Sequence, residues 1–277
     1  MTYKTILVHC DGGGTMSHSL AVGADLATRS GAHLVGLHVR APFQVPVYAE
    51  ATYVVDSIYK AWEESSKAAE ASARGVFGKT LQGKGLSTES RVADGAADRE
   101  IALHARYADL TIVGQAGADN DQNAPDLPET VALATGRGVL VVLWIGTATM
   151  PGKTVMLCWN ASREAARAVA DAMPLLEGAA AVHVLILDPE TSGGAHGAEP
   201  GADIATFLSR HGVKVTVRRE SAPELDVGET ILSRAADLGA DLIVMGIYGH
   251  SRLREMVLGG ASRTMLRSMT VPVLMAH

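Results

Sequence analysis

The chain has 277 residues, of which 47% are hydrophobic, 4% aromatic and 19% charged, and its formal net charge is −6. This composition excludes a disordered chain, and an acidic chain without a long basic run argues against nucleic acid as a main partner. Two cysteines, Cys10 and Cys158, form no CxxC or Cys/His pattern, so neither a disulfide framework nor a zinc site is expected.

The first half begins directly with a strand pattern, without the charged and apolar regions of a signal peptide, so we expect a cytoplasmic protein. No apolar stretch reaches the length of a membrane span. Each half is predicted to have five strands that alternate with four helices. In the first half the strands include the apolar runs 4–8, 33–39, 108–114 and 138–144. The helices of this half include Ser17 to Ser30, Ile58 to Gly78 and Asp98 to Tyr107.

The second half repeats this order. Its five predicted strands include the runs 153–157, 181–187, 240–246 and 272–275. Its predicted helices are Arg163 to Leu176, Ala202 to His211, Gly228 to Leu238 and Ser262 to Ser268. Lys4-Thr5-Ile6-Leu7-Val8 returns as Lys153-Thr154-Val155-Met156-Leu157, and the Ala-Asp pair at 108–109 returns at 240–241. The sequence therefore predicts an internal duplication.

Strands that are apolar at nearly every position, instead of alternating between apolar and polar residues, are typical of parallel sheets covered on both faces. Here such strands follow one another with a helix between each pair. We therefore predict an α/β fold of two tandem, doubly wound, Rossmann-like parallel sheets, with domains over residues 1–146 and 152–277. Two segments differ between the halves, 41–59 and 191–201, and both are candidate lids or ordinary variable loops. Ligands of open α/β sheets bind at the carboxyl ends of strands, where these segments lie.

One segment of the second half carries a recognisable pattern of glycines. Gly246 is followed after two residues by Gly249 and after nine more by Gly259, and Gly259-Gly260-Ala261-Ser262 leads into a predicted helix. Glycine after a strand lets main chain approach a ligand closely. The exposed N–H groups at a helix start suit phosphate, and Ser262 adds a hydroxyl donor or caps the helix.

This pattern, with the following Val271-Pro272-Val273-Leu274, resembles the ATP-binding signature of the universal stress protein family, and the resemblance covers nearly the whole chain twice. It implies five-stranded, adenine nucleotide alpha hydrolase-like sheets with strand order 3-2-1-4-5 and a role in the stress response. It also implies that ATP or AMP, with Mg²⁺ as a candidate companion, binds in the second domain with little turnover. The positions carried over are Asn160, Leu187, Gly246, Gly249, Gly259, Gly260, Ala261 and Ser262. His250, inside the glycine segment, is a further candidate for ligand contact or an ordinary surface-loop residue.

This half departs from the family at two positions. The family usually has Asp where Asn160 stands, and Ser or Thr where Gly260 stands. Asn keeps an acceptor and adds donors, so a changed base or ribose preference is expected. Arg252 and Arg263 are candidates for contact with phosphate, although ordinary helix-surface charge explains them equally well.

The first half is degraded at the phosphate position. Pro125 and Asp126 stand opposite Gly259 and Gly260, where Pro lacks an N–H donor and Asp repels phosphate. This half keeps Asp11, Gly114 and Gly117, and we interpret it as a pseudo-site. The turn 11–15 is either an anion nest or an ordinary tight turn. His9 and His38 lie in or beside adjacent strands, as a metal or acid–base pair or as ordinary core residues.

No P-loop, nucleophile elbow or paired-carboxylate pattern is present, so at most slow ATP hydrolysis is expected, with Asp188 and Glu255 as its candidate groups. The serious alternative is a nucleotide-free scaffold or a carrier of another small ligand. In the family the last strands pair across a dimer. Here the runs 139–144 and 271–275 are expected to pair inside one chain as a pseudo-dimer, and association of two chains as a homodimer is a further expectation.

Overall fold

The structure, a computed structural model, describes residues 2–14, 16–44, 52–115, 126–143, 151–189, 198–221, 226–247 and 260–277. The first repeat holds β1 Thr5–His9, α1 Met16–Ser30, β2 His33–Arg40, α2 Thr52–Leu81, β3 Thr88–Asp94, α3 Ala97–Ala105, β4 Leu110–Gly114, α4 Leu127–Thr135 and β5 Gly138–Val142. The second holds β6 Thr154–Cys158, α5 Arg163–Gly178, β7 Ala181–Leu187, α6 Ala202–Arg210, β8 Val215–Glu220, α7 Val227–Asp237, β9 Leu242–Gly246, α9 Gly260–Ser268 and β10 Val273–Ala276.

The strands form one ten-stranded sheet in the order β3-β2-β1-β4-β5-β10-β9-β6-β7-β8. Counted within its own repeat, each half has the expected order 3-2-1-4-5, and its strands are parallel. The halves join where β5 and β10 pair antiparallel, with Leu140 opposite Leu274. These two leucines are equivalent in the repeat, so a pseudo-two-fold axis passes between them. The expected pairing of the last strands within one chain is confirmed.

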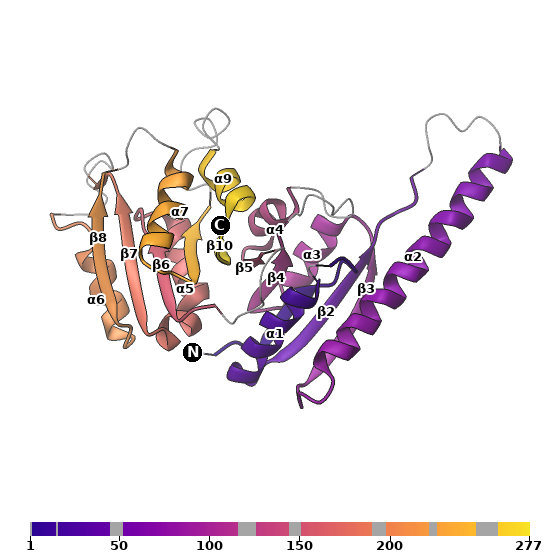
Figure 1. The fold of residues 1–277 in the computed structure, drawn as a ribbon, viewed down its shortest axis with the longest axis horizontal. Coiled ribbons are helices and arrows are strands. Elements are labelled where there is room, and N and C mark those ends of the chain that lie inside the picture. Colours follow the sequence, from indigo (N-terminus) through magenta and orange to yellow (C-terminus); the bar gives the residue numbers. More distant parts are fainter. Residues whose placement is uncertain are drawn as a thin grey trace.

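Helices cover both faces of the sheet (Figure 1). One buried cluster contains residues of α1, α2, α5 and α6, and the other contains residues of α3, α4, α7 and α9. The strands contribute to both clusters alternately, as Val8 and Leu7 illustrate, because successive side chains point to opposite faces. This arrangement explains why the strand sequences are apolar without alternation.

The repeated Ala-Asp pair has a structural role. Asp241, just before β9, accepts hydrogen bonds from the main-chain N–H groups of Gly152, Lys153 and Thr154 at 3.0, 3.1 and 3.0 Å. Asp109 in the first repeat accepts the N–H groups of Lys4 and Thr5 in the same way. Each carboxylate therefore fixes the start of the first strand of its repeat beside the fourth.

Helix α2 differs most from its prediction, because it begins at Thr52, six residues before the expected start at Ile58. The segment considered as a lid, 41–59, therefore ends in helix, and α2 extends well beyond the sheet at the right of Figure 1. Of the other candidate lid, only 198–201 is described, as a turn leading into α6. Within the described residues, no helix combines the length and the apolar character needed to cross a membrane.

Candidate functional site

The candidate site lies at the carboxyl edge of the second repeat, and its first element is the turn after β6. Asn160 is exposed, and its Oδ1 accepts a hydrogen bond from the N–H of Ser162 at 3.2 Å. Ala161 between them has φ 58°, in the left-handed region. The Ser162 hydroxyl then caps α5 by accepting from the N–H of Ala165 at 3.1 Å. One lone pair of the Asn160 oxygen serves its own turn, and the amide NH₂ group adds donors that a carboxylate at this position would lack.

Leu187 ends the neighbouring strand β7 at the same edge. The register pairs Cys158 with Leu185, so the main chain of Leu187 lies just beyond the end of β6. Its side chain is half-buried and packs against the core. Asp188 follows with φ 44°, and its N–H donates to the carbonyl of Glu220 at 2.9 Å. The chain therefore turns sharply here and leaves the edge of β7 at Leu187.

Gly246 ends β9 on the other side of β6, and its lack of a side chain is required by a helix. A Cβ built at Gly246 would lie 2.5 Å from the nitrogen of Ala165 and 2.6 Å from the carbonyl carbon of Glu164. The first turn of α5 therefore packs directly on the main chain at this point. We expected a ligand to approach this glycine; the close approach in the structure is made by α5, and ligand contact stays a prediction.

The start of α5 is already occupied by a negative charge. Glu164 in its first turn is only 3% exposed. Burial is the largest single influence on Glu164 and opposes its ionisation. Hydrogen bonds from Arg163, at 2.5 Å, from the main-chain N–H of Glu164 and from Ser162, together with the charge of Arg163, outweigh burial and hold the pKa of this carboxyl below its usual value. An ionised carboxylate is stabilised near the positive, N-terminal end of a helix, and it repels a second anion there. A phosphate at this edge would therefore be disfavoured beside α5.

Helix α9 offers the other helix start at this edge. It begins at Gly260, and because it connects β9 to β10 it runs back antiparallel to them, with its first residues at the carboxyl edge. Ser262, its third residue, is half-buried. The hydroxyl of Thr264 lies 3.5 Å from Asp226, which caps α7 by accepting from the N–H of Gly228 at 2.6 Å.

The remaining site predictions are not described by the structure. Gly249, His250 and Gly259 lie outside the described residues, as do Arg252 and Glu255. Ala261 is described only as part of α9. Among the described residues, no group of three or more His, Cys, Asp or Glu side chains is placed to hold a metal ion. The carboxyl edge thus brings together Asn160, Leu187 and Gly246, with the start of α9 on the same edge.

Comparison with known proteins identifies the repeated unit. The sequence model of the Universal stress protein family matches residues 2–123 and again 152–277. The chain belongs to the universal stress protein family. A universal stress protein of Synechocystis sp. is 39% identical over 70 residues, which are 24% of this chain and only 22% of that protein.

Solved structures of universal stress proteins share the tandem fold. The structure from Archaeoglobus fulgidus DSM 4304 has a TM-score of 0.68 at 17% identity, covering 98% of this chain and 95% of that one. A putative universal stress protein of Pseudomonas aeruginosa UCBPP-PA14 has a TM-score of 0.62 at 18% identity, covering 99% and 93%. At these identities the likeness is one of fold.

In the first universal stress protein repeat, the glycine-rich turn after β1 is a tight turn. Asp11, 8% exposed, accepts the N–H of Gly13 at 2.9 Å, and Gly12 has φ 80°. An N–H that an anion nest would direct at a ligand is thus bonded to the turn's own carboxylate. Asp126 precedes α4 without a side-chain capping bond. Gly114 ends β4, whereas Gly117 and Pro125 lie outside the described residues.

The two histidines of the first repeat do not form a pair. His38 donates from Nδ1 to the carbonyl oxygen of Cys10 at 2.7 Å, and both residues line a small cavity with Phe77. Strand alternation directs the side chain of His9 to the opposite face of the sheet. Burial lowers the pKa of His9 to about 4, so His9 is a neutral core residue at neutral pH.

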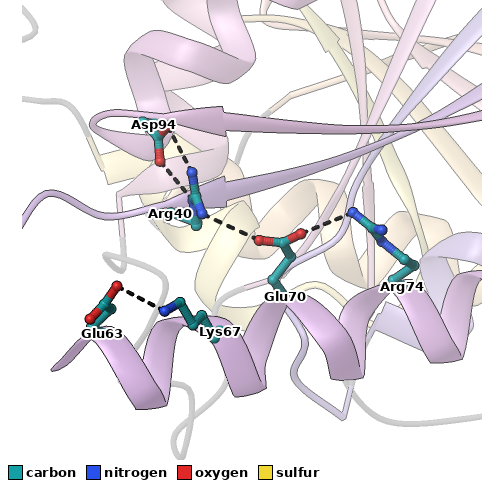
Figure 2. Close-up of polar contacts among 6 residues, drawn as sticks. All are labelled: Arg40, Glu63, Lys67, Glu70, Arg74 and Asp94. Atoms are coloured by element: carbon teal, nitrogen blue, oxygen red, sulfur yellow. Dashed lines mark hydrogen bonds and ion pairs between the residues drawn. The ribbon is translucent and has the colours of Figure 1, made fainter. Parts of the chain in front are cut away.

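An ion-pair network at this edge was not anticipated from the sequence. Arg40, at the end of β2, bonds both carboxylate oxygens of Asp94 at the end of β3, at 2.7 and 2.9 Å (Figure 2). Its other nitrogen lies 3.4 Å from Glu70 of α2, which also accepts from Arg74 at 2.9 Å. The network ties α2 to two strands. Its one sequence signal was Arg40, a charged residue directly after the apolar run 33–39.

Proposed function

We propose that this protein binds an adenine nucleotide, ATP or AMP, at the carboxyl edge of the second repeat and acts as a regulatory protein of the stress response with little turnover. In this proposal Asn160 and the main chain of Leu187 contact the adenosine part. Gly246, Gly249 and His250 line the ribose and phosphate path. Gly259, Gly260, Ala261 and Ser262 bind the phosphates. The proposed domains are 1–146 and 152–277, and the cytoplasmic location stays a prediction.

The observation that carries this proposal is the difference between the two helix starts at this edge. The start of α5 holds the ionised carboxylate of Glu164, whereas α9 begins with small residues from Gly260. A phosphate would be favoured by the positive end of α9 and by the main-chain N–H groups of its first turn. Gly260, Ala261 and Ser262 are small, and small residues let a ligand approach the main chain closely. Mg²⁺, if bound, would take most of its oxygen ligands from the phosphates and water.

A calorimetric titration of nucleotide-stripped protein with Mg-ATP tests the proposal. We expect one site in the wild type, lost in Gly259→Asp, because the new carboxylate repels phosphate. Asp126→Gly in the degraded first repeat is the matched control and should leave the stoichiometry at one site. No binding by the wild type, with no nucleotide found by mass spectrometry in the untreated protein, would refute the proposal.

A scaffold or a carrier of another small ligand is the second candidate, and the turn after β6 favours it. Asn160 presents an amide donor at the position where the family usually has a carboxylate acceptor. A ligand group that can only accept hydrogen bonds would suit this amide donor, whereas a ribose hydroxyl, which also donates, is matched better by the carboxylate of the family. Preference for such a ligand over ATP, reversed in Asn160→Asp, would support this alternative.

A further inference from the structure

Helix α9 ends without the cap that its counterpart has. The last four carbonyls of a helix lack partners within it. Helix α4 of the first repeat is followed by Gly136 with φ 64°, the left-handed conformation that commonly closes a helix. The repeat alignment that pairs Gly138 with Pro272 places Thr270 at the position of Gly136. Thr270 is not a glycine and does not have a positive φ, so α9 has no left-handed glycine cap.

The missing cap is supplied by the first repeat. Gln115 follows β4, is 4% exposed, and donates from Nε2 to the carbonyl oxygens of Leu266 at 2.9 Å and Arg267 at 3.4 Å. Its own N–H donates to the carbonyl of Val142 at 2.7 Å, which fixes its main chain to the end of β5. Its Oε1 is buried with no partner among the described residues. The bonds to α9 therefore set the orientation of this amide.

This contact has no counterpart in the other direction. The residue equivalent to Gln115 in the second repeat is Ile247, which has no side-chain donor, so α4 receives no such bond from it. An ion pair also joins the two helices. Arg263 in the first half of α9 lies 3.8 Å from Glu129 of α4, and these two positions are equivalent in the repeats. The two helices lie side by side over the middle of the sheet (Figure 1).

We propose that Gln115 is a positioning residue for the nucleotide site: it caps α9 from the first repeat and holds the helix so that its start at Gly260 faces the phosphates. This inference rests on the proposed function. An α-helix is stiff over nine residues, about 13 Å, so fixing its last turn limits the tilt of its first. The first repeat, degraded at its own phosphate position, thereby serves the site of the second.

The test compares Gln115→Met with Tyr3→Phe. Methionine keeps the length and loses the donor. Tyr3→Phe removes another side-chain bond between the repeats, from the Tyr3 hydroxyl to the carbonyl of Asp171 at 2.8 Å, on the opposite face of the sheet. Each variant is titrated with ATP and with adenosine, and hydrogen exchange of the α9 amides is measured without nucleotide. Gln115→Asn, too short to reach α9, is the second variant should Met disturb folding.

We expect Gln115→Met to weaken ATP binding about two- to tenfold, which corresponds to the free energy that one hydrogen bond typically contributes. Adenosine, which has no phosphate, should bind as in the wild type, and α9 amides should exchange faster. Tyr3→Phe should change neither the ATP-to-adenosine ratio nor exchange in α9. An unchanged ratio and unchanged exchange in Gln115→Met, or equal changes in Tyr3→Phe, would overturn the inference. If the wild type binds no nucleotide, the proposed function fails, and exchange in α9 alone still decides whether Gln115 is its cap.

Discussion

Replacing Gly246 with alanine should destabilise the protein before any ligand is considered. The added methyl group would lie 2.5 to 2.9 Å from three atoms of Glu164 and Ala165, two of them main-chain atoms. Carbon and nitrogen atoms in contact normally stay about 3.5 Å apart, so the start of α5 must move by roughly 1 Å. Overpacking of this kind costs about 1–3 kcal/mol. We expect the upper part of that range, because a helix main chain gives way less readily than a side chain.

Urea unfolding and calorimetry of nucleotide-free protein measure this effect. For a chain of this size, about 2–3 kcal/mol corresponds to a melting temperature lower by roughly 4–12 °C. Gly75→Ala in α2 is the matched control, because a Cβ there meets nothing within 4 Å. It should stabilise by up to about 1 kcal/mol through helix propensity. Wild-type stability of Gly246→Ala without nucleotide, together with lost ATP binding, would refute the packing argument and assign Gly246 to the ligand.

Three further outcomes are expected. Gly36→Ala should cost about 1–3 kcal/mol in urea unfolding, because its methyl group would lie 2.4 Å from the ring of Phe77; wild-type stability would contradict the packing of α2. Asp241→Ala should cost about 2–4 kcal/mol by the same assay, since three main-chain N–H groups lose a charged acceptor, and Asp241→Asn should lose less. Because the pKa of His9 falls from about 6.5 to about 4 on folding, the unfolded chain binds more protons between these values. The contribution of His9 to the free energy of unfolding is therefore fully present above pH 6.5 and is lost as the pH falls from 6.5 to 4. His9→Gln should lose less stability over this pH range than the wild type, and an equal loss in the two proteins would contradict this reasoning.

Local features made much of the fold predictable. Unbroken apolar runs before small residues indicated buried parallel strands, and the return of the same runs in the same order indicated two repeats. The Ala-Asp pairs at 108–109 and 240–241 were recognised only as repeated letters, yet their carboxylates fix strand starts. The start of α2 was predicted too late, because Thr52, Tyr53, Val54 and Val55 have a low intrinsic helix propensity and gave no local sign of a helix.

The sequence by itself determined properties of short segments, namely the strand and helix pattern, the duplication, and the glycine spacing that resembles a nucleotide site. Only the tertiary structure decided which contacts those residues make. Gly246 packs against the first turn of α5, and Glu164 places a negative charge at the start of that helix. Strand register brings Gly246 and Glu164 together although they are 82 positions apart in the sequence. The cap of α9 comes from Gln115, 151 residues earlier in the chain. No local pattern encodes such a contact, because it exists only once β5 and β10 have joined the two repeats.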